Sequence, residues 1–201
     1  MMNDKSLVQV KIGITGGIGS GKTYICNLLR ERGYEVYNCD DEAKRIMLED
    51  AEIISQIKTL IGNDAYTPDG QLNKPVIANF IFSDKDNAAK VNSIVHPAVK
   101  KDFLHWAEDK PVAIMESAIL FESGFDDVVD TTVLIWADAR NRLKRAMTRD
   151  HATREQIEAR MAAQISDDEA RHKADYIFRH NNYDETENEM RKLIQYIENY
   201  S

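Results

Sequence analysis

The chain has 201 residues, of which 43% are hydrophobic and 30% charged, a composition typical of a globular protein with one substantial core. Its net charge of −8 argues against a general affinity for nucleic acids or membrane surfaces, which requires a basic face. We therefore expect neither kind of partner. Residues 1–6 are polar and lack the apolar core of a signal peptide, so we expect a cytoplasmic location, with Cys26 and Cys39 as reduced thiols.

Residues 16–23, Gly-Gly-Ile-Gly-Ser-Gly-Lys-Thr, match the phosphate-loop pattern G-x-x-x-x-G-K-[ST] at every fixed position. A β-branched run at 10–15 predicts a buried strand before the loop, and helical spacing of apolar residues predicts a helix over 24–32. The glycines allow backbone N–H groups to point inward, towards an anion at the helix N-terminus. We expect Lys22 to contact the β- and γ-phosphates of a nucleotide and the Thr23 hydroxyl to ligate Mg²⁺. The alternative is a glycine-rich turn that binds nothing.

Two acidic residues, Asp40 and Asp41, follow the second predicted strand, at 34–37. Open α/β sheets place ligand-binding groups just beyond their strand ends. Asp40 is either the cap of the next helix or a carboxylate that faces the phosphate loop and accepts a proton from a hydroxyl nucleophile. The spacing alone leaves both interpretations open.

Helical patterns fill the long stretch between the second and third predicted strands. They cover 41–61, 72–82 and 84–106, with Ser83 as the expected cap of the last helix and a kink or division expected at Pro97. A simple crossover needs only about a dozen residues. The surplus predicts a helical lobe over the carboxyl edge of the sheet.

The third predicted strand, 111–116, ends in Glu116, at the place of the acidic residue that supports Mg²⁺ in phosphate-loop proteins. A helix predicted over 139–150 carries Arg142, Arg145 and Arg149 on one face. These arginines form either a solvated basic stripe or a set that folds over the transferring phosphoryl group. The remaining predicted elements are a strand at 131–136, a helix at 154–164, a strand at 174–178 and a helix at 184–200.

An ordered set of motifs resembles the dephospho-coenzyme A kinase family over nearly the whole chain. The phosphate loop of that family reads T-G-G-I-G-S-G-K, as at 15–22 here. The other matching segments are 38–43 (D-A-D-x-x-A), 92–97 (N-x-I-x-H-P), 118–122 (P-L-L-F-E), 149–150 (R-D), 160–164 (R-x-x-x-Q) and 174–175 (A-D). The chain departs from the family pattern at Tyr24, Asn38, Glu116, Ala118 and His180.

The resemblance implies an α/β phosphate-loop kinase with a five-stranded parallel sheet of order 2-3-1-4-5 and helices on both faces. It implies a core of about 8–40, 111–137 and 174–201, an inserted substrate lobe of about 41–110, and a helical lid of about 138–173. The implied reaction transfers the γ-phosphoryl group of ATP, bound with Mg²⁺, to the 3′-hydroxyl of dephospho-coenzyme A, the last step of coenzyme A synthesis.

The resemblance and the loop pattern together assign the candidate site residues. Lys22, Asp40 and Arg149 are the expected catalytic residues, with Asp40 as general base, and Thr23 is the expected metal ligand. The expected ATP contacts are Gly17, Ile18, Gly19, Ser20, Gly21, Lys22, Thr23, Tyr24, Arg145, Arg149 and Asn181, with His180 as the alternative to Asn181 at the adenine. The expected contacts of dephospho-coenzyme A are Asp40, Lys44, His96, Phe121 and Glu122.

Other functions share parts of this pattern. A kinase for another small molecule, such as a nucleoside monophosphate, would keep the core and differ in the lobe at 41–110. A nucleotide-dependent switch such as a GTPase would need a D-x-x-G after a strand and an N-K-x-D motif, and the sequence has neither. A pure binding module would not need Asp40 near the phosphates.

Overall fold

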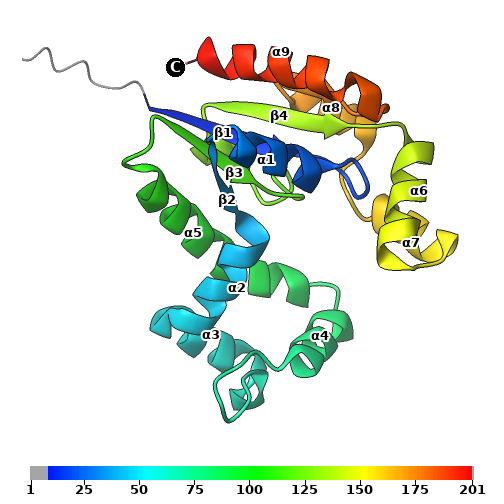
Figure 1. Cartoon of the computed structure of the whole chain (residues 1–201). Coiled ribbons are helices and arrows are strands. Elements are labelled where there is room, and N and C mark those ends of the chain that lie inside the picture. Colours follow the sequence, from blue (N-terminus) through cyan, green and yellow to red (C-terminus); the bar gives the residue numbers. More distant parts are fainter. Residues whose placement is uncertain (1–8, 201) are drawn as a thin grey trace, which may run out of the picture. The chain divides into compact units, whose positions relative to one another are not determined.

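The structure, a computed structural model, describes residues 9–200 (Figure 1). The polar start at 1–6 and the outermost residues of the predicted core, 8 and 201, lie outside this range. The described chain divides into two compact units. The first runs up to Tyr37 and resumes at Ala107, and the second is Asn38–Trp106.

A five-stranded sheet forms the centre of the first unit, in the order β2-β3-β1-β4-β5. The strands are β1 (Val10–Thr15), β2 (Glu35–Asn38), β3 (Val112–Glu116), β4 (Thr131–Trp136) and β5 (Tyr176–Arg179). β1 pairs in parallel with β3 and with β4, and β4 pairs in parallel with β5. The predicted α/β class and strand order are confirmed.

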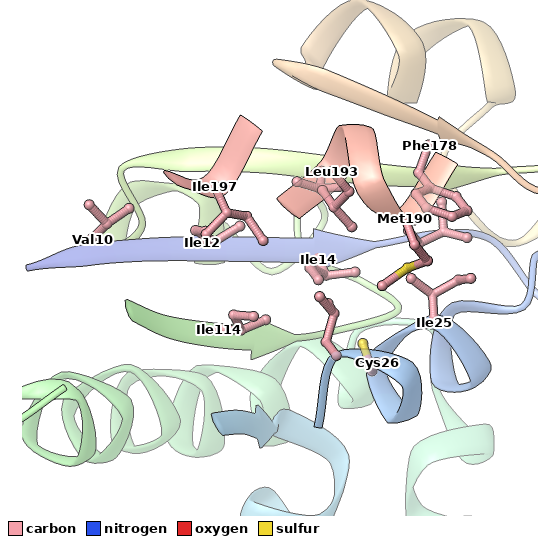
Figure 2. Packing of buried hydrophobic residues seen from close by; sticks show 13 residues of the cluster. Val10, Ile12, Ile14, Ile25, Cys26, Ile114, Phe178, Met190, Leu193 and Ile197 are labelled. Carbon is pink, nitrogen blue, oxygen red and sulfur yellow. The ribbon is translucent and has the colours of Figure 1, made fainter. Parts of the chain in front are cut away.

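The core of this unit packs one face of β1 against two helices that are far apart in sequence (Figure 2). The helices are α1 (Lys22–Glu31) and α9 (Thr186–Glu198). The contacts are made by buried aliphatic and aromatic side chains, each of which contributes about 1.5–3 kcal/mol when fully buried. They include Ile12, Ile14, Ile25, Leu29, Phe178, Met190, Leu193 and Ile197. Because this packing fixes α1 on β1, it also fixes the two ends of the loop that joins them.

Along the chain, three helices connect β4 to β5, namely α6 (Ala139–Asp150), α7 (Arg154–Ala162) and α8 (Asp167–Lys173). Helix α8 was not predicted, although Ser166 caps it by accepting the Glu169 N–H. Its seven residues give too few turns for a clear apolar period. Before α9, the chain makes a 3₁₀ turn, Tyr183–Glu185, where the sequence predicted a regular helix.

The second unit is helical, with α2 (Cys39–Glu49), α3 (Ala51–Ile61), α4 (Lys74–Ser83) and α5 (Asn87–Ala107), the last ending at the unit boundary. A 3₁₀ turn, Asn63–Ala65, follows α3. The single helix predicted over 41–61 is wrong, because Asp50 leaves the helical conformation and caps α3 by accepting the N–H groups of Glu52 and Ile53.

Helix α5 continues through Pro97, with buried Val95 and Val99 on both sides of the proline, so it is not divided there. The alternative of a kink at Pro97 stays a prediction. One further expectation for this unit is corrected. Ser83 ends α4, where its hydroxyl donates to the Phe80 carbonyl, and does not cap α5.

Among the described residues, no helix has the length and apolarity needed to cross a membrane. The expected absence of membrane and nucleic-acid partners stays a prediction.

Candidate active site

The phosphate loop joins the end of β1 to the start of α1 and uses positive φ angles at Gly19 (77°) and Gly21 (94°). A Cβ at Gly19 would lie 2.1 Å from the Arg142 carbonyl oxygen, and one at Gly21 would lie 2.4 Å from the His180 ring. Glycine is therefore required at both positions for two reasons: the positive φ angle, and the close neighbours that leave no room for a Cβ. Gly21 offers no side chain to cap α1, so the first N–H groups of this helix have no acceptor within it.

A buried carboxylate, Glu116, lies beneath the start of α1. Its Oε1 atom accepts from Lys22 Nζ at 2.8 Å and from the Thr23 hydroxyl at 3.1 Å, and Arg30 Nη2 lies 3.6 Å from Oε2. Burial alone would raise the pKa of Glu116, but Lys22, Thr23 and Arg30 together lower it below its ordinary value. Glu116 is thus held as an anion beside the lysine and the hydroxyl of the loop.

Both cysteines are buried free thiols, as predicted. Burial, followed by the charge of Glu116, raises the pKa of Cys26 well above its ordinary value. Since the thiolate is the reactive form, Cys26 is a packing residue of α1.

The three arginines that the sequence placed on one face of α6 have three different environments. Arg142 is 4% exposed, donates through Nε to the Ile18 carbonyl at 3.1 Å, and pairs with Asp167. Arg145 donates through Nη1 to the His180 carbonyl at 2.8 Å, so the solvated-stripe interpretation is wrong for both residues. Arg149 is exposed and pairs with its neighbour Asp150.

Asp150 joins α6 to α7, because it accepts from Arg149 and from Arg160 Nη1, the latter at 2.6 Å. Hydrogen bonds from Arg149 and Arg160 lower the pKa of Asp150 to about 2. The R-D and R-x-x-x-Q segments noted in the sequence therefore meet at this carboxylate.

An aromatic cluster lies against the loop on the side of β5. His180 is fully buried, its ring stacks on Tyr24 with centroids 5.6 Å apart, and Tyr183 meets it edge-on at 4.9 Å. Burial, and then the charge of Arg145, lowers the pKa of His180 to about 4. Asn181 Oδ1 accepts the Asp138 N–H at 2.7 Å, so this oxygen anchors the start of α6. Which of the two residues meets adenine stays a prediction.

The predicted substrate residues Phe121 and Glu122 belong to the turn after β3. Phe121 is buried, with Lys173 Nζ 5.8 Å from its ring centroid. Glu122 Oε1 accepts the Ile165 N–H at 3.0 Å. In this structure Glu122 therefore holds the connection between α7 and α8.

The predicted site residues Asp40, Lys44 and His96 lie in the second unit. Asn38 Oδ1 caps α2 by accepting the N–H groups of Asp40 and Asp41, so the interpretation of Asp40 as the cap is wrong. Lys44 pairs with Asp41 at 3.0 Å. His96 is half-buried, and its pKa is lowered, chiefly by burial and secondly by the charge of Lys100.

Sequence reasoning missed three contributors to the loop: Gln164, Asp167 and the packing role of His180. Gln164 Oε1 accepts the Ile18 N–H at 2.8 Å, across 146 positions of sequence. The family motif marks this glutamine, but no local pattern connects it to the loop. Asn38 could have been found, because an asparagine directly before a helical pattern is a standard cap signal.

A phosphate loop that joins the central strand of a parallel sheet to a helix defines a P-loop α/β protein. Shikimate kinase from Bacteroides thetaiotaomicron shares this fold, with a TM-score of 0.56 at 14% identity over 94% of this chain and 98% of that one. A structure titled TT1252 from Thermus thermophilus is more similar, with a TM-score of 0.79 at 28% identity over 94% and 95% of the two chains.

The family follows from the sequence comparisons. A family model described as "Dephospho-CoA kinase" matches residues 10–186. A relative named dephospho-CoA kinase, from Bacteroides fragilis, is 41% identical over 173 residues, which is 85% of this chain and 84% of the relative. The chain belongs to the dephospho-CoA kinase family.

Proposed function

We propose that this protein transfers the γ-phosphoryl group of ATP to the 3′-hydroxyl of dephospho-coenzyme A, giving coenzyme A and ADP in the last step of coenzyme A biosynthesis. The observation that carries the proposal is the family match over residues 10–186, which includes the phosphate loop with Lys22 and Thr23. The buried pairing of Lys22 with Glu116 supports it, since it holds the ammonium group at the start of α1.

The nucleotide would lie on the loop, with its phosphates at the N–H groups that open α1. Lys22 brings the full positive charge, and Gly17, Ile18, Gly19, Ser20, Gly21, Thr23 and Tyr24 complete the expected contacts. Arg145 and Asn181 would meet the nucleotide from the β5 side. Charge on the migrating group is what such a site has to stabilise, because phosphoryl transfer asks for little covalent chemistry from the protein.

The oxygen atoms at the start of α1 fit Mg²⁺. The Thr23 hydroxyl and Glu116 Oε1 lie 3.1 Å apart, and hydroxyl and carboxylate oxygens are ligands that Mg²⁺ prefers. Within residues 9–200, no cluster of three or more His, Cys, Asp or Glu side chains could hold a metal. This suits an ion that arrives with the ATP phosphates, where it neutralises charge when bound.

The acceptor contacts are those that the family resemblance implies. Asp40 would orient the 3′-hydroxyl and take its proton, and Lys44, His96, Phe121 and Glu122 would contact the rest of dephospho-coenzyme A. The predicted lobe at 41–110 and the predicted lid at 138–173 are part of this proposal. Arg149 suits the lid because it is exposed and, within residues 9–200, forms its ion pair with the neighbouring Asp150. Its guanidinium group can therefore exchange that carboxylate for a phosphoryl group.

Turnover of dephospho-coenzyme A at saturating ATP tests the proposal. Lys22→Ala removes the charge of the loop and leaves its backbone intact, so we expect turnover to fall by about two orders of magnitude or more. In the same assay Arg149→Met should lower turnover while leaving the melting temperature near that of the wild type. Near-normal turnover of Lys22→Ala would show that this loop is not catalytic.

A further inference from the structure

Ile18 lies near the tip of the phosphate loop. Its backbone N–H and its carbonyl both form hydrogen bonds with residues outside the loop. Its N–H donates to Gln164 Oε1 at 2.8 Å, and its carbonyl accepts from Arg142 Nε at 3.1 Å. Gln164 lies in the connection between α7 and α8, and Arg142 lies in α6 (Figure 1). Both partners thus come from the segment between β4 and β5.

Residues 164–167, here called the strap, are themselves anchored. The Ile165 N–H donates to Glu122 at 3.0 Å, and the Asp167 carboxylate pairs with buried Arg142. A cavity of about 20 Å³ is lined by the strap and by residues of the loop and sheet. Since this volume holds roughly one water molecule, the strap packs closely on the loop.

The strap contacts the loop at Ile18, which lies outside α1. The N–H groups that start α1 are oriented by the helix, which β1 and α9 fix through the core. Ile18 lies four positions before Lys22, the first residue of α1, and is therefore outside the helix. A loop whose tip is fixed in advance loses less conformational freedom when phosphates bind, so its affinity is higher.

We propose that Gln164 is a positioning residue for the nucleotide: its side-chain oxygen fixes Ile18, and with it the phosphate loop, in the conformation that binds ATP. The proposal rests on the proposed function, in that the loop must bind a nucleotide. It assigns a role to the strap that involves no contact with the nucleotide itself.

The test is the dissociation constant of ADP, measured by calorimetry on the full chain, alongside a melting curve. Gln164→Met keeps the length of the side chain and removes the acceptor, and we expect ADP binding to weaken about 3- to 10-fold, the worth of one hydrogen bond. Gln164→Asn keeps the amide but shortens its reach, so it should weaken binding in the same sense even if the methionine variant folds poorly.

Gln156 provides the matched control, because its side-chain oxygen also accepts a backbone N–H, that of Thr153, at the other end of α7. Gln156→Met should lower the melting temperature without changing the affinity for ADP. Unchanged or tighter ADP binding in both Gln164 variants would overturn the proposal, as would an equal weakening in Gln156→Met. A wild-type protein that binds no ADP would instead overturn the proposed function.

Discussion

Asn38 accepts the N–H groups of Asp40 and Asp41, and so performs the capping that the sequence left as one role for Asp40. The family pattern has an aspartate at position 38, and asparagine caps a helix about as well. The departure at Asn38 therefore keeps the helix start while removing a charge beside Asp40. The capping role is thus filled by Asn38, and the chemical role of Asp40 stays a prediction.

Asp40→Asn separates chemistry from structure at this residue. The amide has nearly the same shape but no proton-accepting carboxylate, so we expect turnover to fall by roughly 10²–10⁴-fold, nearer the lower end because loose phosphoryl-transfer transition states ask little of a base. The melting temperature should stay unchanged. Asp41→Asn is the matched control and should keep near-normal turnover. If Asp40→Asn turns over at the wild-type rate, the base must be sought first at Asp41 and then at Glu122.

At the scale of elements, the connection from β5 to α9 places the His180 imidazole against Gly21 of the phosphate loop. His180 is buried, its Nδ1 lies 3.3 Å from the Thr186 hydroxyl, and Nε2 has no hydrogen-bond partner within residues 9–200. A neutral ring suits this place, because a charged one would lie buried near Arg145. The pKa of about 4 expresses that preference.

Buried His180 makes the stability of the folded chain depend on pH. The pKa of His180 is about 4 in the folded chain and about 6.5 in the unfolded chain, so below pH 6.5 the unfolded chain binds more protons and stability falls as the pH drops towards 4. We expect the wild type to lose about 2–3 kcal/mol more than His180→Asn between pH 7 and 4.5. Urea unfolding at both pH values measures this difference. Parallel losses in the two proteins would contradict it.

Local signals predicted most of the elements but misplaced their ends. The β-branched runs and the glycine loop predicted β1 and the start of α1 because both depend on neighbours in sequence. Asp50 was missed as a break, since apolar residues continue at helical spacing on both sides of it. The division considered at Pro97 does not occur, because α5 continues through the proline despite the loss of one backbone donor.

At the scale of the whole molecule, the sheet order came from the family resemblance, and the structure confirms it. What the sequence could not predict are contacts between distant segments. Arg142 looked like part of a solvated or phosphate-binding stripe, but it is buried against the loop by a fold that brings α6 to Ile18. Such pairings depend on tertiary packing and leave no local pattern.

The identity of the phosphoryl acceptor defines the proposed activity. The most direct measurement incubates the full chain with ATP, Mg²⁺ and one acceptor at a time: dephospho-coenzyme A, shikimate or a nucleoside monophosphate. Mass spectrometry then identifies the product, and phosphorus NMR locates the new group. We predict that dephospho-coenzyme A gains one phosphoryl group at its ribose 3′-hydroxyl, with an equal amount of ADP formed. Unchanged dephospho-coenzyme A, alongside a phosphorylated product from another acceptor, would contradict the account.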